Sequence, residues 1–347
     1  MTQGLRKVYP APSSRGRRDG APPGRGPGGP PGAPRRNDAA ARGRSGHGDS
    51  NDIVALVGLD LEIRGGEFFG LLGPNGAGKT TTIGILTTRV RATAGRGVVA
   101  GADVGVEAVA VRQRIGVVPQ RPNPDRSLSV LDNLVFHAAY FGIPRGRATA
   151  RAHALLEQFE IDARADAKVD ELSGGQQQRL MIARALIHEP RVIFLDEPTV
   201  GLDPQARRSL WDILRDLHAQ GRTIVMTTHY MEEADRLCER LAIVDEGRLL
   251  ALDTPAALRA RAPGGTLVEL MLDGDAGPAA ALVQTVPYVT DVSARDGVLR
   301  VYSERGGQII PALIDRIQSG GRSVTNINLA APSLETLFLS LTGKKLD

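Results

Sequence analysis

The segment Gly73 to Thr80, GPNGAGKT, constrains this 347-residue chain more than any other feature. It matches the pattern G-x-x-x-x-G-K-[ST], with a short apolar run at 68–72 before it and a predicted helix from about Gly78 after it. Glycines let backbone N–H groups surround phosphate oxygens, and the helix N-terminus adds a favourable dipole. We therefore predict a phosphate-binding loop, made of Gly73, Pro74, Asn75, Gly76, Ala77, Gly78, Lys79, Thr80 and Thr81.

Four side chains are suited to nucleotide chemistry. Lys79 is placed to contact the β- and γ-phosphates, and the Thr80 hydroxyl to ligate Mg²⁺. The segment VIFLDE at 192–197 reads as a buried strand whose carboxyl end carries Asp196 and Glu197, where open α/β sheets bind ligands. Asp196 fits a Mg²⁺ role, and Glu197 is placed to polarise the attacking water as general base. These features predict a P-loop nucleoside triphosphatase, and at this point kinases, GTPases and helicases all still fit.

The order of predicted elements defines the fold class. Strands at 57–63, 115–118, 192–195, 223–227 and 241–245 alternate with helices, one of them from Pro204 to Gln220, which predicts a parallel α/β sheet. We assign an ATPase domain to residues 52–258, with a helical subdomain at about 121–185. In residues 265–347 the predicted order is β-α-β-β-α-β, as in a ferredoxin-like sandwich, with its first strand at 267–272 and its first helix at 278–286. A helix at 334–342 follows. This accessory α/β domain contains no obvious catalytic constellation.

The segment 10–51 is rich in Gly, Pro and Arg. From residue 10 to residue 50 it contains no Val, Ile, Leu, Met or aromatic residue, so we predict a disordered insertion. It holds eight arginines against three aspartates, so the net charge of +4 and the pI of about 9.4 describe this segment rather than the folded part. No specific nucleic-acid partner is therefore expected from charge alone. Its arginines would suit a contact with anionic lipid or nucleic acid, and a plain solvated linker is the alternative.

Hydropathy and cysteine content limit where the chain works. No stretch approaches the ~18 to 20 apolar residues that a membrane span needs, and the N-terminus lacks the apolar core of a secretory signal. Any role in transport therefore requires a membrane-embedded partner. Cys238 is the only cysteine, so no internal disulfide is possible, and we expect a small buried residue in a reducing compartment.

A second phosphate-binding helix start is predicted at Leu172 to Arg179, LSGGQQQR. Ser173 offers a hydroxyl cap, and the two glycines leave backbone N–H groups bare. One nucleotide does not need two such sites. The economical explanation is a dimer in which this helix caps the nucleotide held by the other subunit.

The complete set of motifs resembles the ABC ATPase family over roughly residues 53–254. In order they are GPNGAGKT, Gln120 in VVPQ, LSGGQ, VIFLDEP, Asp203 in GLDP and His229 in TTH. The resemblance implies bound ATP and Mg²⁺, and it implies that Gln120 senses Mg²⁺ and water and couples to a membrane partner. It also implies that Asp203 links the two sites of a homodimer and that His229 holds the γ-phosphate and positions Glu197. The signature residues implied to reach the nucleotide in trans are Ser173, Gly174, Gly175 and Gln176.

Longer stretches resemble the drug-resistance and nodulation-factor exporter ATPases of this family, for example LDEPTVGLDP and the C-terminal PSLETLFLSLTGKKL. That resemblance implies a peripheral subunit at the cytoplasmic face of the membrane. It would drive a separately encoded permease for a drug, lipid or glycan-like substrate. An importer ATPase is one alternative. A soluble ATPase acting on ribosomes or DNA is another, although only 92 residues separate Thr80 from Ser173, which leaves no room for a long coiled coil.

The N-terminus departs from the family pattern. Members begin with a strand that leads to an aromatic residue stacked on adenine, and here GLRKVY ends at Tyr9 with about 40 low-complexity residues after it. We assign residues 1–9 as a candidate first strand, although the sequence pattern barely supports it, with Tyr9 as the adenine-stacking aromatic residue. Either the following residues are an insertion in a surface hairpin, or the start of the domain is altered.

Overall fold

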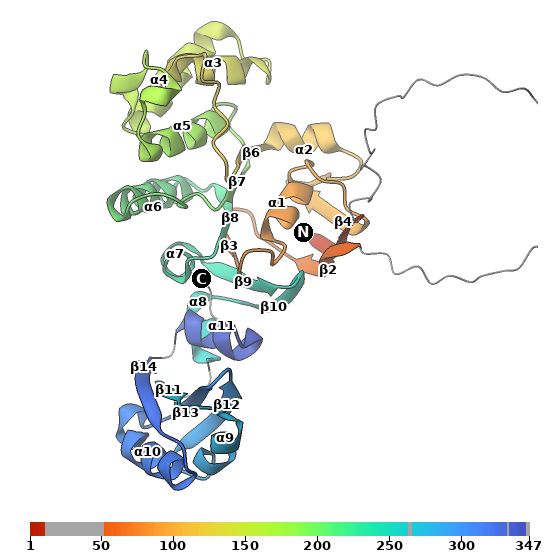
Figure 1. The fold of residues 1–347 in the computed structure, drawn as a ribbon. Coiled ribbons are helices and arrows are strands. Elements are labelled where there is room, and N and C mark those ends of the chain that lie inside the picture. Colours follow the sequence, from red (N-terminus) through yellow and green to blue (C-terminus); the bar gives the residue numbers. More distant parts are fainter. Residues whose placement is uncertain (11–51, 263–265, 332, 345–347) are drawn as a thin grey trace, which may run out of the picture.

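A six-stranded sheet forms the centre of the computed structural model, which describes residues 1–10, 52–262, 266–331 and 333–344 (Figure 1). Its strand order is β10-β9-β3-β8-β7-β6, and only β10 is antiparallel to its neighbour. The parallel pairing brings the carboxyl ends of β3, β7 and β8 to one edge. The strands are β3 (Phe68–Leu72), β6 (Ile115–Val118), β7 (Val192–Asp196), β8 (Thr223–Thr228), β9 (Arg240–Asp245) and β10 (Arg248–Asp253).

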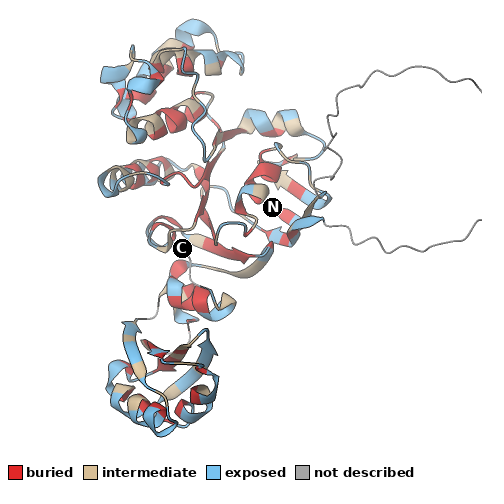
Figure 2. Cartoon of the chain, in the orientation of Figure 1, coloured by how far each residue is buried: buried red, intermediate tan, exposed pale blue. Residues whose placement is uncertain are grey.

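Alternate side chains of the central strands enter two different cores, as the period of a strand requires. Phe68 and Leu72 pack into the larger core with α5, α6 and α7, whereas Phe69 and Leu71 pack into the other with α1 and α2. Figure 2 shows buried residues running along these strands. The covering helices are α1 (Lys79–Leu86), α2 (Ala108–Arg114), α5 (Gly174–Leu186), α6 (Pro204–Ala219), α7 (Met231–Leu237) and α8 (Pro255–Ala260). Cys238 is buried beside α7, as expected.

A second, antiparallel sheet of order β2-β1-β4-β5 packs on the second core. Its strands are β1 (Thr2–Tyr9), β2 (Ile53–Leu61), β4 (Ala94–Val99) and β5 (Ala102–Asp103). The candidate first strand at 1–9 is present as β1, which is eight residues long although the sequence pattern barely supported it. Backbone pairing to β2 on one side and β4 on the other holds it in place, although few of its residues are apolar. Tyr9 pairs with Ile53, so the intervening segment joins neighbouring antiparallel strands, as the hairpin interpretation requires. The predicted disorder of 10–51 falls, apart from residue 10, outside the described residues.

Three helices form the helical part of the chain next to this centre: α3 (Val130–Ala139), α4 (Arg145–Gln158) and the start of α5. Ser129 caps α3 by accepting a hydrogen bond from the Asp132 N–H. Leu134 and Leu156 enter the larger core, so these helices share apolar contacts with the central sheet. None of the described helices is long and apolar enough to cross a membrane.

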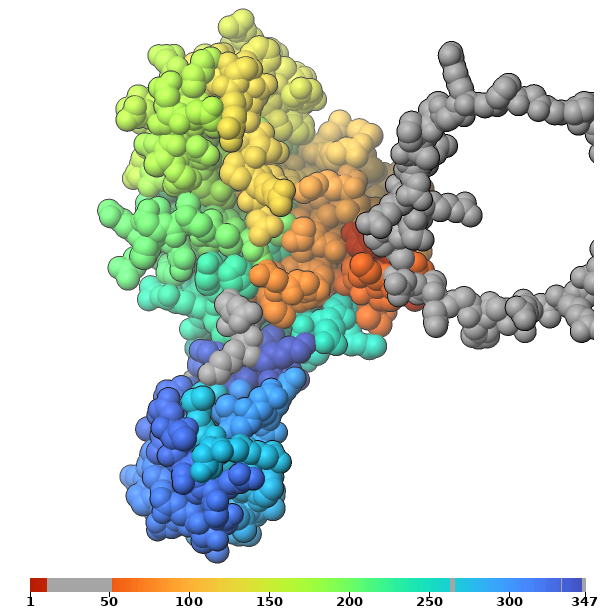
Figure 3. Space-filling view, in the orientation of Figure 1, coloured from red at the N-terminus to blue at the C-terminus, as the bar shows by residue number. Residues whose placement is uncertain are grey.

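The C-terminal sheet has the order β12-β13-β11-β14 and is antiparallel throughout, as in a ferredoxin-like sandwich. Helices α9 and α10 supply the other side of its own core. In Figure 3 these residues form a separate blue lobe. The elements are β11 (Thr266–Leu272), α9 (Gly277–Val283), β12 (Val289–Arg295), β13 (Val298–Ser303), α10 (Ile310–Ser319), β14 (Val324–Ala330) and α11 (Leu334–Thr342).

Helix α11 connects this lobe to the centre of the molecule. Leu334, Leu337 and Phe338 are buried in the larger core with residues of α7 and α8, and Leu339 packs against the C-terminal sheet. Just beyond the helix, the Lys344 Nζ lies 3.2 Å from Asp245 Oδ2 and 2.8 Å from Glu246 Oε1. One helix thus shares its apolar side chains between both parts of the chain.

Candidate active site

The loop at 73–78 joins β3 to α1 and lies very close to its neighbours. A Cβ on Gly73 would be 2.2 Å from the Val244 carbonyl oxygen. Gly78 has φ = 100°, and a Cβ there would be 2.7 Å from the Ala55 carbonyl oxygen. Both contacts are too short for any side chain. Glycine is therefore required for the tight curve that points backbone N–H groups at a phosphate.

Lys79, the first residue of α1, holds a buried ammonium group above this loop. Its side chain is 4% exposed. The Nζ donates hydrogen bonds to the carbonyl oxygens of Gly73 (2.7 Å) and Pro74 (3.1 Å) and lies 3.1 Å from Glu197 Oε1. A desolvated cation that is held in place attracts phosphate oxygens more strongly than a solvated one. The geometry therefore fits the predicted contact with a nucleotide.

Asp196, at the end of β7, forms a compact oxygen cluster with two threonines. Its Oδ1 accepts hydrogen bonds from Thr80 Oγ1 (3.1 Å) and Thr227 Oγ1 (2.7 Å). A hydroxyl and a carboxylate side by side are the hard oxygen ligands that Mg²⁺ prefers. Sequence reasoning did not single out Thr227. The signal for it was the register, because Thr227 lies opposite Asp196 on the adjacent strand.

Glu197 is the point at which the predicted catalytic residues meet. It is buried, and its φ of 50° is unusual for a residue other than glycine. Its Oε2 accepts a hydrogen bond from Gln120 Nε2 (3.0 Å) and lies 3.4 Å from His229 Nδ1. The backbone N–H of Glu197 donates to Thr227 Oγ1 (3.0 Å). This backbone turn places the carboxylate beside Lys79 while Asp196 faces Thr80.

A pocket of about 420 Å³ adjoins this cluster, and it extends along the loop to the N-terminal sheet. Tyr9, Ile53, Val54 and Ala55 line it together with the loop. Ile53 and Val54 are 61% and 46% exposed, so the pocket has an apolar wall as well as a phosphate-binding floor. Sequence reasoning missed these two residues. Their only signal was apolar character at the exposed start of a strand.

The signature residues lie elsewhere in the chain. Ser173 Oγ accepts from the Gln176 N–H (3.3 Å), and Gln176 Oε1 accepts from the Ser173 N–H (3.0 Å), so the predicted cap is confirmed. Asp203 caps α6 by accepting hydrogen bonds from the backbone N–H groups of residues 205 (3.0 Å) and 206 (2.8 Å). Ser173, Gly174 and Asp203 are exposed, Gly175 is half-buried, and none of the four is among the described residues that line the 420 Å³ pocket. One chain alone does not bring both helix starts to one nucleotide.

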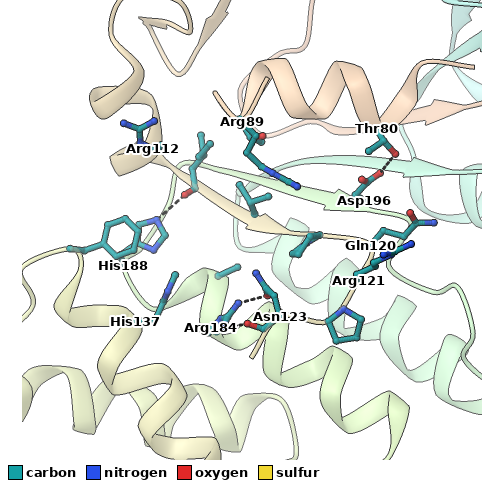
Figure 4. Close-up of a pocket in the computed structure, with 17 residues that line it drawn as sticks. Thr80, Arg89, Arg112, Gln120, Arg121, Asn123, His137, Arg184, His188 and Asp196 are labelled. Carbon is teal, nitrogen blue, oxygen red and sulfur yellow. Dashed lines mark hydrogen bonds between the residues drawn. The ribbon is translucent and has the colours of Figure 1, made fainter. Parts of the chain in front are cut away.

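A larger cavity of about 640 Å³ continues from the same cluster toward α3 and α5 (Figure 4). Thr80, Gln120 and Asp196 line one end, and His137 and His188 line the other. Gln120 and Thr80 therefore line both cavities. The side chain of Gln120, which also holds Glu197, is a physical connection between them.

A parallel sheet, a glycine-rich loop after β3 and adjacent carboxylates after β7 define a P-loop nucleoside triphosphatase. The exposed start of α5, capped by its own Ser173, is the place where the sequence predicts a second phosphate-binding helix start. The family model for the ABC transporter matches residues 56–200.

Individual relatives extend that match along the chain. The chain is 40% identical over 296 residues to the Nod factor export ATP-binding protein I of Rhizobium sp. (strain N33), covering 85% of this chain and 94% of the relative. It is 34% identical over 293 residues to the linearmycin resistance ATP-binding protein LnrL of Bacillus subtilis (strain 168), with 84% and 94% covered. The chain therefore belongs to the ABC transporter ATPase family, and it is an ATP-binding ATPase.

A solved structure agrees with this assignment. An ATP-binding cassette dimer in a post-hydrolysis state bound to ADP and Pi superimposes with a TM-score of 0.57 at 26% identity, covering 73% of this chain and 98% of that chain.

Proposed function

We propose that this chain is the ATP-hydrolysing subunit of an exporter that drives a separately encoded membrane permease. The observation that carries the proposal is the convergence of Lys79, Gln120 and His229 on the Glu197 carboxylate, beside the Thr80 and Asp196 oxygens. The relatives' names, which concern Nod factor export and linearmycin resistance, favour export over import and over a ribosomal or DNA role. A drug, lipid or glycan-like substrate fits both names.

The geometry supports a division of labour in hydrolysis. The loop N–H groups and Lys79 hold the β- and γ-phosphates, while Thr80, Asp196 and Gln120 would hold Mg²⁺. When bound, the metal would neutralise phosphate charge. Glu197 accepts a proton from the attacking water, and His229 and Gln120 fix the orientation of its carboxylate. The strained backbone of Glu197 persists because its N–H is bound by Thr227.

The second half of each site comes from another copy of the chain. In the homodimer, Ser173, Gly174, Gly175 and Gln176 of one subunit reach the γ-phosphate held by the other. Asp203 lies at the boundary between the two sites. Two observations support this arrangement. The start of α5 is accessible, and Gly175 is close to the start of α6, where a Cβ would lie 3.2 Å from the Ala206 Cβ.

We propose that the permease docks at the 640 Å³ cavity, at the cytoplasmic face of the membrane. Four arginines line it, namely Arg89, Arg112, Arg121 and Arg184, and Asp196 is the one acidic residue among its described lining. Burial lowers the pKa of His137 to about 4 and also lowers the pKa of His188, so both rings are neutral at pH 7. The cavity is therefore cationic through its arginines alone.

Exposed aromatic residues extend this surface beyond the cavity. Phe136 on α3 and Tyr140, the C-cap of that helix, are 57% and 86% exposed. The centre of the Tyr140 ring lies 6.3 Å from that of His137, which lines the cavity. Inside it, the rings of Phe141 and His188 are stacked 3.6 Å apart. A cationic cavity with an aromatic rim fits a short helix of the permease that presents acidic and apolar side chains.

The test reconstitutes the chain with a candidate permease of about six apolar spans. We expect Arg89→Glu and Arg121→Glu each to lower permease-stimulated ATPase activity by about tenfold or more, because like charges are then opposed. Activity of the isolated chain should stay unchanged. Arg316→Glu on α10 is the matched control. Wild-type stimulation in both cavity variants would contradict this docking site.

A further inference from the structure

Glu233, on α7, is a buried carboxyl to which the mechanism above gives no role. It is 0% exposed, and its Oε1 accepts a hydrogen bond from Trp211 Nε1 of α6 (3.1 Å). Burial raises its pKa above the ordinary 4.5, and the Thr228, Trp211 and Thr199 groups and the Arg207 charge oppose that rise. Those four residues therefore face the carboxyl from β8, from α6 and from the loop after β7.

The elements around Glu233 are the ones that carry the predicted catalytic residues. Thr228 ends β8 and directly precedes His229, and Thr199 follows Glu197 by two residues. Arg207 lies in the first turns of α6, whose N-cap is Asp203, and its backbone N–H donates to the Asp203 carbonyl (2.9 Å). One side chain thus faces the three segments that carry His229, Glu197 and Asp203.

A chain of ring contacts leads from this point to the active site. The Arg207 guanidinium lies 4.4 Å from the centre of the Tyr230 ring. The Tyr230 ring centre is 4.1 Å from that of His229, and His229 Nδ1 is 3.4 Å from Glu197 Oε2. A shift of α6 would therefore be passed directly to the His229 ring.

Unmatched polar atoms are concentrated in the same place. Among the described residues, six buried side-chain nitrogen or oxygen atoms make no hydrogen bond, and four of them belong to Thr199, Arg207, His229 and Glu233. Buried polar groups are almost always paired, so such a concentration needs a reason. The reason we infer is that this region has a second conformation, in which these atoms form hydrogen bonds with other partners.

We propose that Glu233 is a positioning residue that sets the His229 loop relative to α6, so that His229 and Asp203 move together. The inference rests on the proposed roles of these two residues. Glu233 touches no reacting atom and acts through His229. Its buried carboxyl, held by Trp211 and facing Arg207, ties α7 to α6, and it also faces Thr228 and Thr199 on the segments that carry His229 and Glu197.

The test compares Glu233→Ala with Glu233→Gln in the full chain. We expect Glu233→Ala to lower kcat by about tenfold to a hundredfold, the effect of a small displacement of catalytic groups. The Kd for a fluorescent ATP analogue should change by less than about twofold, because the loop and Lys79 are untouched. Glu233→Gln should restore kcat, since its amide keeps the volume and an acceptor for Trp211.

The matched control is Glu232→Ala, one residue earlier on α7, whose carboxylate is exposed and lies 3.1 Å from Arg236 Nε. It should behave as wild type. If Glu233→Ala does not fold, Trp211→Phe removes the same hydrogen bond while keeping a smaller aromatic ring in the core, and the same fall in kcat is expected. Wild-type kcat in the folded variant, or a Glu233→Gln protein as slow as the alanine variant, would overturn the proposal.

A double variant separates this inference from the proposed function. If Glu233 acts through His229, then Glu233→Ala should have no further effect in a His229→Ala background, measured in single turnovers. If the two variants lower the single-turnover rate by factors that multiply in the double variant, the coupling between Glu233 and His229 is refuted, but the role of His229 is not. Wild-type activity of His229→Ala by itself would instead contradict the assigned role of His229.

Discussion

The two halves of the nucleotide site are built very differently within one chain. Around the glycine-rich loop, side chains from the start of α1 and the end of β7 are already joined, with Lys79 buried against Glu197 and Asp196 bound to Thr80. Around the signature, Ser173 and Asp203 bond only to their own helix starts and remain exposed. The first half is fixed by the fold of the subunit, whereas the second half presents its donors outward.

This difference indicates how hydrolysis is controlled. The buried Lys79 ammonium already lies beside the loop and has only to exchange one of its present acceptors for a phosphate oxygen, so we propose that binding depends on one subunit. We propose that completion of the site depends on contact between two subunits, because the exposed signature residues are not among the described residues that line the pocket. The predictions below test that separation.

The largest effect is expected for Glu197→Gln. The amide keeps the size and the hydrogen bond to Gln120 but cannot accept a proton, so kcat should fall by about a hundredfold to ten-thousandfold while ATP still binds. Gel filtration with ATP should show a trapped dimer. Lys79→Ala is the contrasting variant, because loss of the buried cation should abolish binding itself. Near wild-type turnover by Glu197→Gln would eliminate Glu197 as the base.

Mixing two inactive variants tests whether the signature half acts across the dimer. A Lys79→Ala subunit paired with a Gly175→Asp subunit forms one intact site and one site with both defects. Because a carboxylate at position 175 repels the γ-phosphate, each variant alone should be inactive, and the mixture should regain part of the wild-type ATPase rate. Full activity of Gly175→Asp alone would disprove the trans arrangement.

The apolar wall of the first half can be tested at Tyr9. Stacking of a base on an aromatic ring contributes about 1 to 3 kcal/mol, so Tyr9→Ala should weaken ATP binding by roughly fivefold to a hundredfold. A titration with a fluorescent ATP analogue measures this. Deleting residues 12–48 should leave affinity intact, because loop length affects closure entropy only logarithmically. An unchanged Kd for Tyr9→Ala would show that the ring does not stack on adenine.

The smallest expected effect is a pH dependence of stability that comes from His137, which lines the 640 Å³ cavity at the end away from Gln120. The pKa of His137 is about 4 in the folded chain against 6.5 for an ordinary histidine, so the unfolded chain binds more protons between these values. The contribution of neutral His137 to the free energy of unfolding is therefore fully present above about pH 6.5. The free energy of unfolding should fall by about 1 to 2 kcal/mol from pH 7 to pH 5. Urea unfolding at both pH values measures it, and His137→Phe should reduce the loss. If His137→Phe shows the same pH dependence as the wild type, a group other than His137 causes the loss of stability.

The sequence predicted most of the parallel sheet because its strands are short apolar runs between helices. It also predicted the C-terminal order, with strand 267–272 observed as Thr266–Leu272. It missed β4 and β10 and gave only weak support for β1. The positions of these strands depend on backbone pairing with neighbouring strands rather than on local sequence pattern. The predicted helix at 278–286 ends at Val283, an error of the usual size at a helix end.

For the site, the sequence by itself determined the chemical groups and their order, because phosphate binding requires glycine, lysine and hydroxyl residues at fixed spacing. Only the tertiary structure decided which groups meet. It placed Thr227 opposite Asp196, turned Glu197 toward Gln120 and His229, and brought Ile53 and Val54 beside the loop. Likewise, α11 reads as the last element of the C-terminal domain, yet its apolar side chains are buried against α7 and α8. The physical reason is that such contacts join residues far apart in the chain, whose proximity is fixed by strand register and core packing and not by local spacing.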